Sequence, residues 1–133
     1  MASSPSPVLL DTHIALWILL DAPELPLFIR RAMTAADRDW VFHQISLWEI
    51  QIKYDLGKLG LPAPPQRLLP EAMRRTGFVQ APLEDEAIFL LGKLPAIHRD
   101  PFDRLLIAHA VKNSWVIATV DRVFERYPVR LLE

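Results

Sequence analysis

The sequence of 133 residues contains no cysteine. Disulfide scaffolds, thiolate zinc sites and cysteine nucleophiles are therefore excluded, and the absence suits a reducing compartment. A glycine-rich phosphate loop is also missing, which argues against nucleoside triphosphate chemistry by that route. The 15 basic and 16 acidic residues leave a net charge of -1. Bulk positive charge therefore does not draw this protein to nucleic acid, although a local basic patch is compatible with the balance.

No stretch is long and apolar enough to predict a membrane span. The apolar run over residues 8–20 is interrupted by Asp11 and its polar neighbours, whereas a spanning helix needs about 20 nearly uncharged residues. Residues 1–7 contain no Lys or Arg, so they lack the positive start of a secretory signal. We expect a flexible tail over residues 1–7, a single domain over residues 8–133, and a cytoplasmic protein without a membrane partner.

Short apolar runs alternate with helical patterns along the chain. The runs that predict strands cover residues 8–10, 40–42, 78–79, 115–119 and 129–131. The patterns that predict helices cover residues 13–20, 26–37, 45–59, 66–75, 84–91 and 100–112. Strands that alternate with helices form parallel sheets covered on both faces. We therefore predict an α/β fold, a three-layer α/β/α sandwich with a mostly parallel central sheet of four to five strands.

Two aspartates follow predicted strands. Asp11 ends the first strand, and Asp121 comes one turn after the strand over residues 115–119. Both therefore belong at the carboxyl edge of the sheet, where ligands of such folds bind. Taken singly, each could instead form a turn or cap a helix.

Glu49 lies at the edge of the apolar stripe of the helix predicted over residues 45–59. The stripe recurs with helical period and consists of Ile45, Trp48, Ile52, Leu56 and Leu59. A buried carboxylate must be paired, metal-bound or protonated, because an unpaired buried charge is costly. The alternatives are that Glu49 reaches solvent or forms a capping box with Ser46.

Asp100 and Asp103 open the helix predicted over residues 100–112. Asp100 fits the N-cap, since Pro101 fits the first helical position. Asp103 fits the first turn, where negative charge is favourable, but it shares a helix face with Leu106. Capping therefore explains Asp100 better than it explains Asp103.

The four acids at two strand ends and two helix faces can converge on one pocket: Asp11, Glu49, Asp103 and Asp121. Two unit charges about 4 Å apart repel by about 4 kcal/mol at an effective dielectric of 20, so such a cluster must take up cations or protons. Sites built from oxygen ligands favour Mg²⁺ or Mn²⁺ over zinc. Such ions activate water and stabilise charge on a phosphate, so the predicted chemistry is phosphodiester hydrolysis.

These motifs resemble those of the PIN-domain family, and within it the toxin ribonucleases of VapBC-type toxin–antitoxin pairs. The similar segments span nearly the whole chain and cover residues 9–13, 46–50, 56–59, 98–108 and 119–124. The resemblance implies metal-binding and catalytic roles for the four acids just named. It also implies a Mg²⁺ or Mn²⁺ cofactor, an RNA substrate, an inhibitory cognate antitoxin, and a homodimer or a hetero-oligomer with that antitoxin.

The resemblance extends to the neighbours of the acids. The hydroxyl side chains that it implies as orienting groups for carboxylates or water are Thr12, Ser46 and Thr119. Asp100 matches an additional acid, which binds metal or only caps the helix. His43 and His109 depart from the family pattern, where a small residue and Gln are expected, and this departure bears on the substrate rather than on the chemistry.

Other polar residues adjoin the acids in sequence. Arg99, Arg104 and Arg122 either contact RNA phosphates or offset the acidic charge. His13 and His98 either line the pocket or have purely structural roles. A second apolar set on the helix of Glu49 predicts burial or an interface with a partner, and it consists of Leu47, Ile50 and Tyr54.

The residues and the resemblance together predict a metal-dependent endoribonuclease, the toxin of a toxin–antitoxin pair. Attack by an activated water leaves a 5′-phosphate and a 3′-hydroxyl and needs no ribose 2′-hydroxyl as nucleophile. One alternative is a PIN-like nuclease that acts on DNA or structured nucleic acid. Another is a non-catalytic PIN-like binding module whose acids only cap helices and balance arginines.

Overall fold

A computed structural model describes residues 5–35 and 37–133 and contains one five-stranded sheet. The strands are β1 (Val8–Leu10), β2 (Trp40–His43), β3 (Val79–Ala81), β4 (Val116–Ala118) and β5 (Arg130–Leu131). Their order across the sheet is β3-β2-β1-β4-β5, and every neighbouring pair is parallel. The predicted parallel sheet is confirmed, with all five of its strands.

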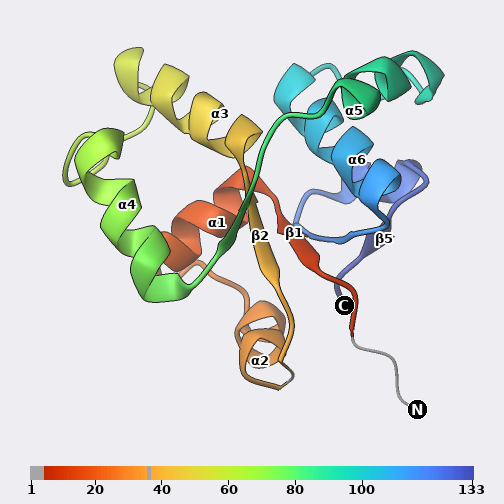
Figure 1. The fold of residues 1–133 in the computed structure, drawn as a ribbon. Coiled ribbons are helices and arrows are strands. Elements are labelled where there is room, and N and C mark those ends of the chain that lie inside the picture. The colour runs from red at the N-terminus through yellow and green to blue at the C-terminus, as the bar shows by residue number, and fades with distance from the viewer. Residues whose placement is uncertain (1–4, 36) are drawn as a thin grey trace.

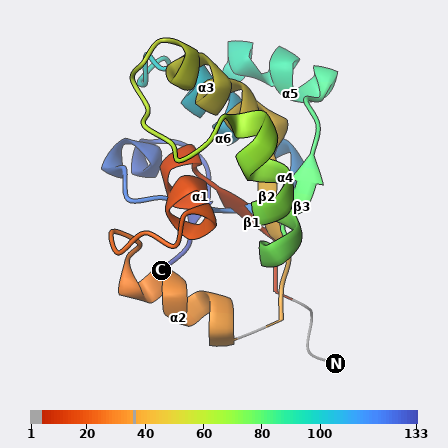
Figure 2. The ribbon, with the colours of Figure 1, turned by 90° about the vertical axis from the view of Figure 1, so that its left-hand side faces the viewer.

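Helices cover both faces of this sheet (Figures 1 and 2). They are α1 (Thr12–Leu19), α2 (Leu27–Ala35), α3 (Gln44–Asp55), α4 (Pro65–Thr76), α5 (Asp85–Leu90) and α6 (Pro101–Asn113), with the 3₁₀ turns η1 (Leu91–Lys93) and η2 (Arg122–Arg126). One apolar core lies between the sheet and α1, α2 and α4, and the other lies between the sheet and α5 and α6. These two cores confirm the predicted three-layer sandwich.

The strands are short and apolar because both faces of the sheet are buried. In β1 the alternation of side chains sends Val8 and Leu10 into the first core and Leu9 into the second. Helix α3 starts at the upper end of β2 in Figure 1 and contributes to both cores, Ile50 to the first and Ile45 to the second. The buried residues of α3 lie between Ile45 and Ile50.

Strand β1 is central and has β2 on one side and β4 on the other. The chain thus runs from β1 to β2 in one direction and later returns to β4 in the opposite direction. This reversal of strand order leaves a crevice beyond the carboxyl ends of β1 and β4, which is where ligands of open α/β sheets bind. Asp11 and Thr119 directly follow these two strands.

Helix α3 differs most from the prediction. It was expected to reach Leu59 but ends at Asp55, because Gly57 adopts a φ of +71° that reverses the chain. The predicted apolar stripe is confirmed only at its ends: Ile45 is buried and Leu59 packs against the core, but Trp48 is 53% exposed and Leu56 62% exposed. The inward face instead carries polar residues, Ser46 and Glu49, beside Ile45 and Ile50.

The amino-terminal residues join the sheet. The backbone carbonyl of Ser6 accepts hydrogen bonds from the Arg38 guanidinium, and that of Pro7 accepts one from the Val116 amide. Residues 1–4 of the predicted tail lie outside the described residues. Within the described part of the chain, no helix has both the length and the apolar character needed to cross a bilayer.

Candidate active site

Five carboxylates surround one cavity of about 220 Å³, which we call the acidic cavity. Its lining consists of Asp11, His13, Trp17, Glu49, Lys53, Asp100, Asp103, Val120 and Asp121. Strands β1 and β4 end at this cavity, and helices α3 and α6 supply its other acids. The structure therefore brings together all four acids predicted for the site, and Asp100 with them.

Thr119 connects the ends of the two central strands. Its hydroxyl donates a hydrogen bond to Asp11 Oδ2 at 2.8 Å and accepts one from the Asp121 amide at 3.0 Å. The Asp11 amide in turn donates to the carbonyl of Ala118 at 3.0 Å. Asp11 is buried, and its carboxylate is held in a fixed orientation by groups on the neighbouring strand.

Two further hydroxyls orient Glu49. Thr12 Oγ1 donates to Glu49 Oε1 at 2.7 Å and lies 2.8 Å from Ser46 Oγ. Because the single proton of Thr12 goes to the carboxylate, the hydroxyl of Ser46 is the donor in the second contact. All three side chains are buried. Ser46 thus lies beside Glu49 but does not form the capping box that was weighed from the sequence.

Lys53 lies one helical turn after Glu49 and donates a hydrogen bond to Glu49 Oε2. Although partial burial lowers the pKa of Lys53, the hydrogen bond and charge of Glu49, together with Asp100 and Asp103, raise it overall. Sequence reasoning missed this residue. The available signal was the spacing of four residues between an acid and a lysine on one helix.

The start of α6 carries the remaining pair of acids. Asp100 Oδ1 accepts hydrogen bonds from the amides of Phe102 and Asp103, at 2.8 and 3.2 Å, so Asp100 is the N-cap. Burial, reinforced by the charges of the other four acids, raises the pKa of Asp103 to about 8. Burial also raises the pKa of Asp11, although the hydrogen bond from Thr119 opposes the shift.

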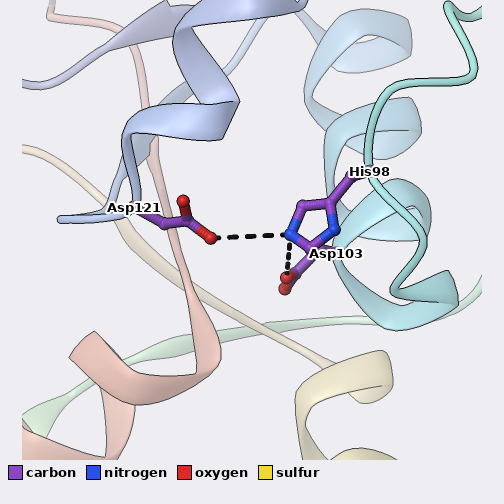
Figure 3. Close-up of side chains that lie close together, drawn as sticks. All are labelled: His98, Asp103 and Asp121. Atoms are coloured by element: carbon purple, nitrogen blue, oxygen red, sulfur yellow. Dashed lines mark ion pairs between the residues drawn. The ribbon is translucent and has the colours of Figure 1, made fainter.

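His98 lies between two of the acids (Figure 3). Its Nε2 is 2.9 Å from Asp103 Oδ2 and 3.5 Å from Asp121 Oδ2, without the alignment of a hydrogen bond. Its Nδ1 accepts a hydrogen bond from the Asp100 amide at 3.2 Å, which assigns the proton of the neutral ring to Nε2. His98 therefore faces these two acids without being one of the residues that line the acidic cavity, whereas His13 does line it.

The donor set of the cavity fits a divalent cation. Each of His98, Asp103 and Asp121 presents one ligand atom, and these atoms lie within 4.8 Å of one another. Burial and the charges of the four neighbouring acids raise the pKa of Asp103 to about 8, so the cavity disfavours a further negative charge unless a cation binds there. A set made mostly of carboxylate oxygens suits Mg²⁺ or Mn²⁺.

The three arginines predicted to contact RNA differ in their surroundings. Arg99 is exposed, and Arg122 is exposed with its Nε 3.8 Å from a carboxylate oxygen of Glu125. Arg104 is half-buried and donates to the carbonyl of Leu91 at 3.1 Å. Arg99 and Arg122 are therefore open to a ligand, whereas the Arg104 guanidinium is committed to η1.

His43 and His109 form a buried pair whose ring centroids are 4.0 Å apart. His43 Nδ1 accepts from the Ile45 amide and so caps α3, and His109 Nε2 accepts from the Glu84 amide. Burial lowers the pKa of His43 to about 4, with the neighbouring His109 adding to the shift. Neither ring lines the acidic cavity.

Comparison with known proteins adds independent information. The PIN domain family matches residues 8–130. Ribonuclease VapC22 of Mycobacterium tuberculosis is 29% identical over 118 residues, which cover 86% of this chain and 87% of that protein. Two solved structures share the fold: VapBC2 from Rickettsia felis bound to a DNA fragment from its promoter (TM-score 0.71, 20% identity, 96% and 97% of the two chains) and FitAcB from Neisseria gonorrhoeae (TM-score 0.66, 17% identity, 95% and 96%).

Proposed function

The chain belongs to the PIN-domain family, and on this premise we propose that it is a metal-dependent endoribonuclease, the toxin of a toxin–antitoxin pair. The observation that carries the proposal is the convergence of five carboxylates, from both ends of the chain, around one cavity. The similarity to ribonuclease VapC22 supports RNA as the substrate. The folds shared with VapBC2 and FitAcB support an antitoxin as the partner.

In this proposal, Asp11, Glu49, Asp103 and Asp121 hold one or two Mg²⁺ or Mn²⁺ ions. Asp100 caps α6 through its Oδ1 and also lines the cavity, so its other oxygen is the candidate for an additional metal ligand. When bound, such an ion supplies an activated water as nucleophile and stabilises the charge that develops on the phosphate. Cleavage then leaves a 5′-phosphate and a 3′-hydroxyl.

The residues around the acids keep the carboxylates in place before any ion arrives. Thr119 holds Asp11, and Thr12 with Ser46 holds Glu49, so these two carboxylates lose little conformational freedom on binding a ligand. His98 Nε2 lies close to Asp103 and Asp121 but makes no aligned hydrogen bond to either carboxylate. At Asp11 and Glu49 the site is therefore preorganised on its strands and helices rather than assembled by the ligand.

Exposed apolar side chains support the proposed protein partner. Trp48 is 53% exposed and packs edge-on against Phe102, with ring centroids 5.4 Å apart, and Leu47 is 41% exposed. Apolar side chains grouped at the surface mark sites of protein association. We assign this surface to the antitoxin or to a second copy of the chain, in a hetero-oligomer or a homodimer.

The test compares Asp11→Asn with the wild type, with Glu71→Gln, at an exposed acid of α4, as the matched control. Purified proteins are incubated with single-stranded RNA and, in parallel, single-stranded DNA, in Mn²⁺ or in a chelator. The wild type and Glu71→Gln should cut RNA only with the metal, whereas Asp11→Asn should not cut despite an unchanged circular dichroism spectrum. Cleavage by Asp11→Asn at the wild-type rate would overturn the assignment. Cleavage of DNA alone would correct the substrate.

A further inference from the structure

A second cavity of about 190 Å³ adjoins the acidic cavity, and we call it the lysine cavity. Its lining consists of Thr12, His13, Leu16, Ile50, Lys53, Lys58 and Leu59. His13 and Lys53 line both cavities, so the two share a wall. The two cavities are therefore neighbours on either side of His13 and Lys53.

The turn after α3 builds this cavity. Gly57, with its φ of +71°, reverses the chain, and the Lys58 amide then donates to the carbonyl of Lys53 at 2.9 Å. Leu59 follows and packs against the core beneath α1. The reversal thus fixes the backbone of Lys58 beside that of Lys53.

The lining of the lysine cavity is divided into two chemical parts. Leu16, Ile50 and Leu59 provide apolar side chains, and the cationic groups are Lys53 and Lys58. Lys53 is paired with Glu49, but none of the ion pairs among the described residues includes Lys58. A free ammonium group beside apolar side chains suits a ligand that is anionic at one end and carries a flat, poorly hydrated ring at the other.

We propose that the lysine cavity binds the nucleotide next to the scissile phosphate of a single-stranded RNA. The phosphate of that nucleotide contacts Lys58, assisted by Lys53. Its base or ribose lies on Leu59, which is partly exposed, whereas Leu16 and Ile50 are buried. This proposal rests on the function proposed above. The lysine cavity adjoins the acidic cavity, so it receives the neighbouring nucleotide only when the scissile phosphate occupies the acidic cavity.

A salt titration gives the first test. Binding of a fluorescent single-stranded oligoribonucleotide is measured by anisotropy in the Asp11→Asn background, with Lys58→Gln added, or with Lys93→Gln at an exposed lysine that lines neither cavity. One phosphate contact contributes about 0.7 to the slope of log affinity against log salt for single strands. Between 50 and 200 mM salt, the parent should therefore lose about 2.6-fold more affinity than Lys58→Gln. Lys93→Gln should match its parent.

Substrate analogues give the second test. Neutral methylphosphonate linkages are placed one at a time along the oligoribonucleotide, and binding is measured for the parent and for Lys58→Gln. One linkage adjacent to the cleavage position should weaken binding to the parent but leave the binding of Lys58→Gln unchanged. When Lys58→Gln is made in the otherwise wild-type enzyme, which retains Asp11, it should also raise KM more than it lowers kcat.

The outcomes separate this proposal from the function on which it rests. If the wild type cuts RNA but Lys58→Gln and Lys93→Gln have equal salt slopes and equal KM, the lysine cavity is not a nucleotide subsite and only this inference falls. The inference falls likewise if Lys58→Gln weakens binding of an acidic peptide but not of RNA. If the wild type neither binds nor cuts RNA in Mn²⁺, the proposed function fails and takes the inference with it.

Discussion

Asp103→Asn should stabilise the metal-free protein at alkaline pH. The carboxylate of Asp103 is largely buried and lies among four other acids, which together with burial raise its pKa to about 8. At pH 9 in a chelator, the wild type must therefore hold a charge that its surroundings disfavour. Asn has nearly the same shape as a neutral Asp and carries no charge at any pH, so the substitution removes this cost.

The magnitude follows from the difference between the folded and unfolded pKa values. Between the ordinary value of 3.8 and the raised value of about 8, the folded protein binds more protons than the unfolded chain. The free energy of unfolding of the wild type therefore falls as the pH rises through this window, by about 1.4 kcal/mol per pH unit. Relative to the wild type, Asp103→Asn should gain about 2.3 kcal/mol between pH 6 and pH 8 and little more above pH 9.

The assay is urea unfolding followed by tryptophan fluorescence, at several pH values between 5 and 9.5, with a chelator present throughout. The exposed substitution Asp85→Asn, on α5 and outside the acidic cavity, controls for the general effect of removing a negative charge. Its difference from the wild type should stay flat with pH. Adding Mg²⁺ at pH 9 should then stabilise the wild type and Asp85→Asn far more than Asp103→Asn.

The reasoning fails if Asp103→Asn and the wild type keep a constant difference in unfolding free energy from pH 5 to pH 9.5. Such a result would mean that the carboxylate is well solvated in the folded protein. If Asp103→Asn instead destabilised the protein increasingly as the pH rises, the folded protein would favour the charged carboxylate, which is the opposite of the raised pKa.

Three further outcomes are expected. Thr12→Val should weaken Mn²⁺ binding by about tenfold or more in calorimetry, since Glu49 loses the hydroxyl that orients it; unchanged affinity would leave Thr12 only a packing role. Relative to His43→Asn, which can still cap α3, the wild type should lose about 2 kcal/mol of unfolding free energy between pH 6.5 and pH 4.5 in urea unfolding, because the unfolded chain protonates His43 more readily. Gly77→Ala should cost about 1 kcal/mol in urea unfolding, since φ there is +72° and an added Cβ meets open space; no loss would show that the helix end relaxes.

The order of elements and the convergence of the acids were predictable from the sequence. Strands that are buried on both faces have continuous apolar sequences. In a parallel sheet, the residues that follow each strand lie at the same edge of the sheet. Asp11 and Asp121 therefore had to be close in space if β1 and β4 were neighbours, and the structure shows that they are. The N-cap at Asp100 was equally readable, because Pro101 follows it.

The orientation of α3 was not predictable from periodicity, and the reason is physical. The face of α3 that points inward carries Ser46 and Glu49, which hydrogen-bond with Thr12 in the buried interior. An apolar stripe marks the buried face of a helix when that face only packs against a core. The buried face of α3 instead carries polar residues of the candidate site, so the stripe does not mark it. The stripe through Trp48 and Leu56 consequently points to solvent. Lys53 was not predicted as a site residue for the same reason, since its contact with Glu49 depends on that orientation.

Strand β1 lies between β2, the next strand along the chain, and β4, which follows much later. This arrangement has a consequence for the synthesis of the protein. Asp11 is translated 108 residues before Thr119, which with Asp121 completes its surroundings. A growing chain that has not yet reached Thr119 therefore has no finished acidic cavity. The proposed hydrolytic capacity would arise only after the segment that follows β4 has left the ribosome and joined β1.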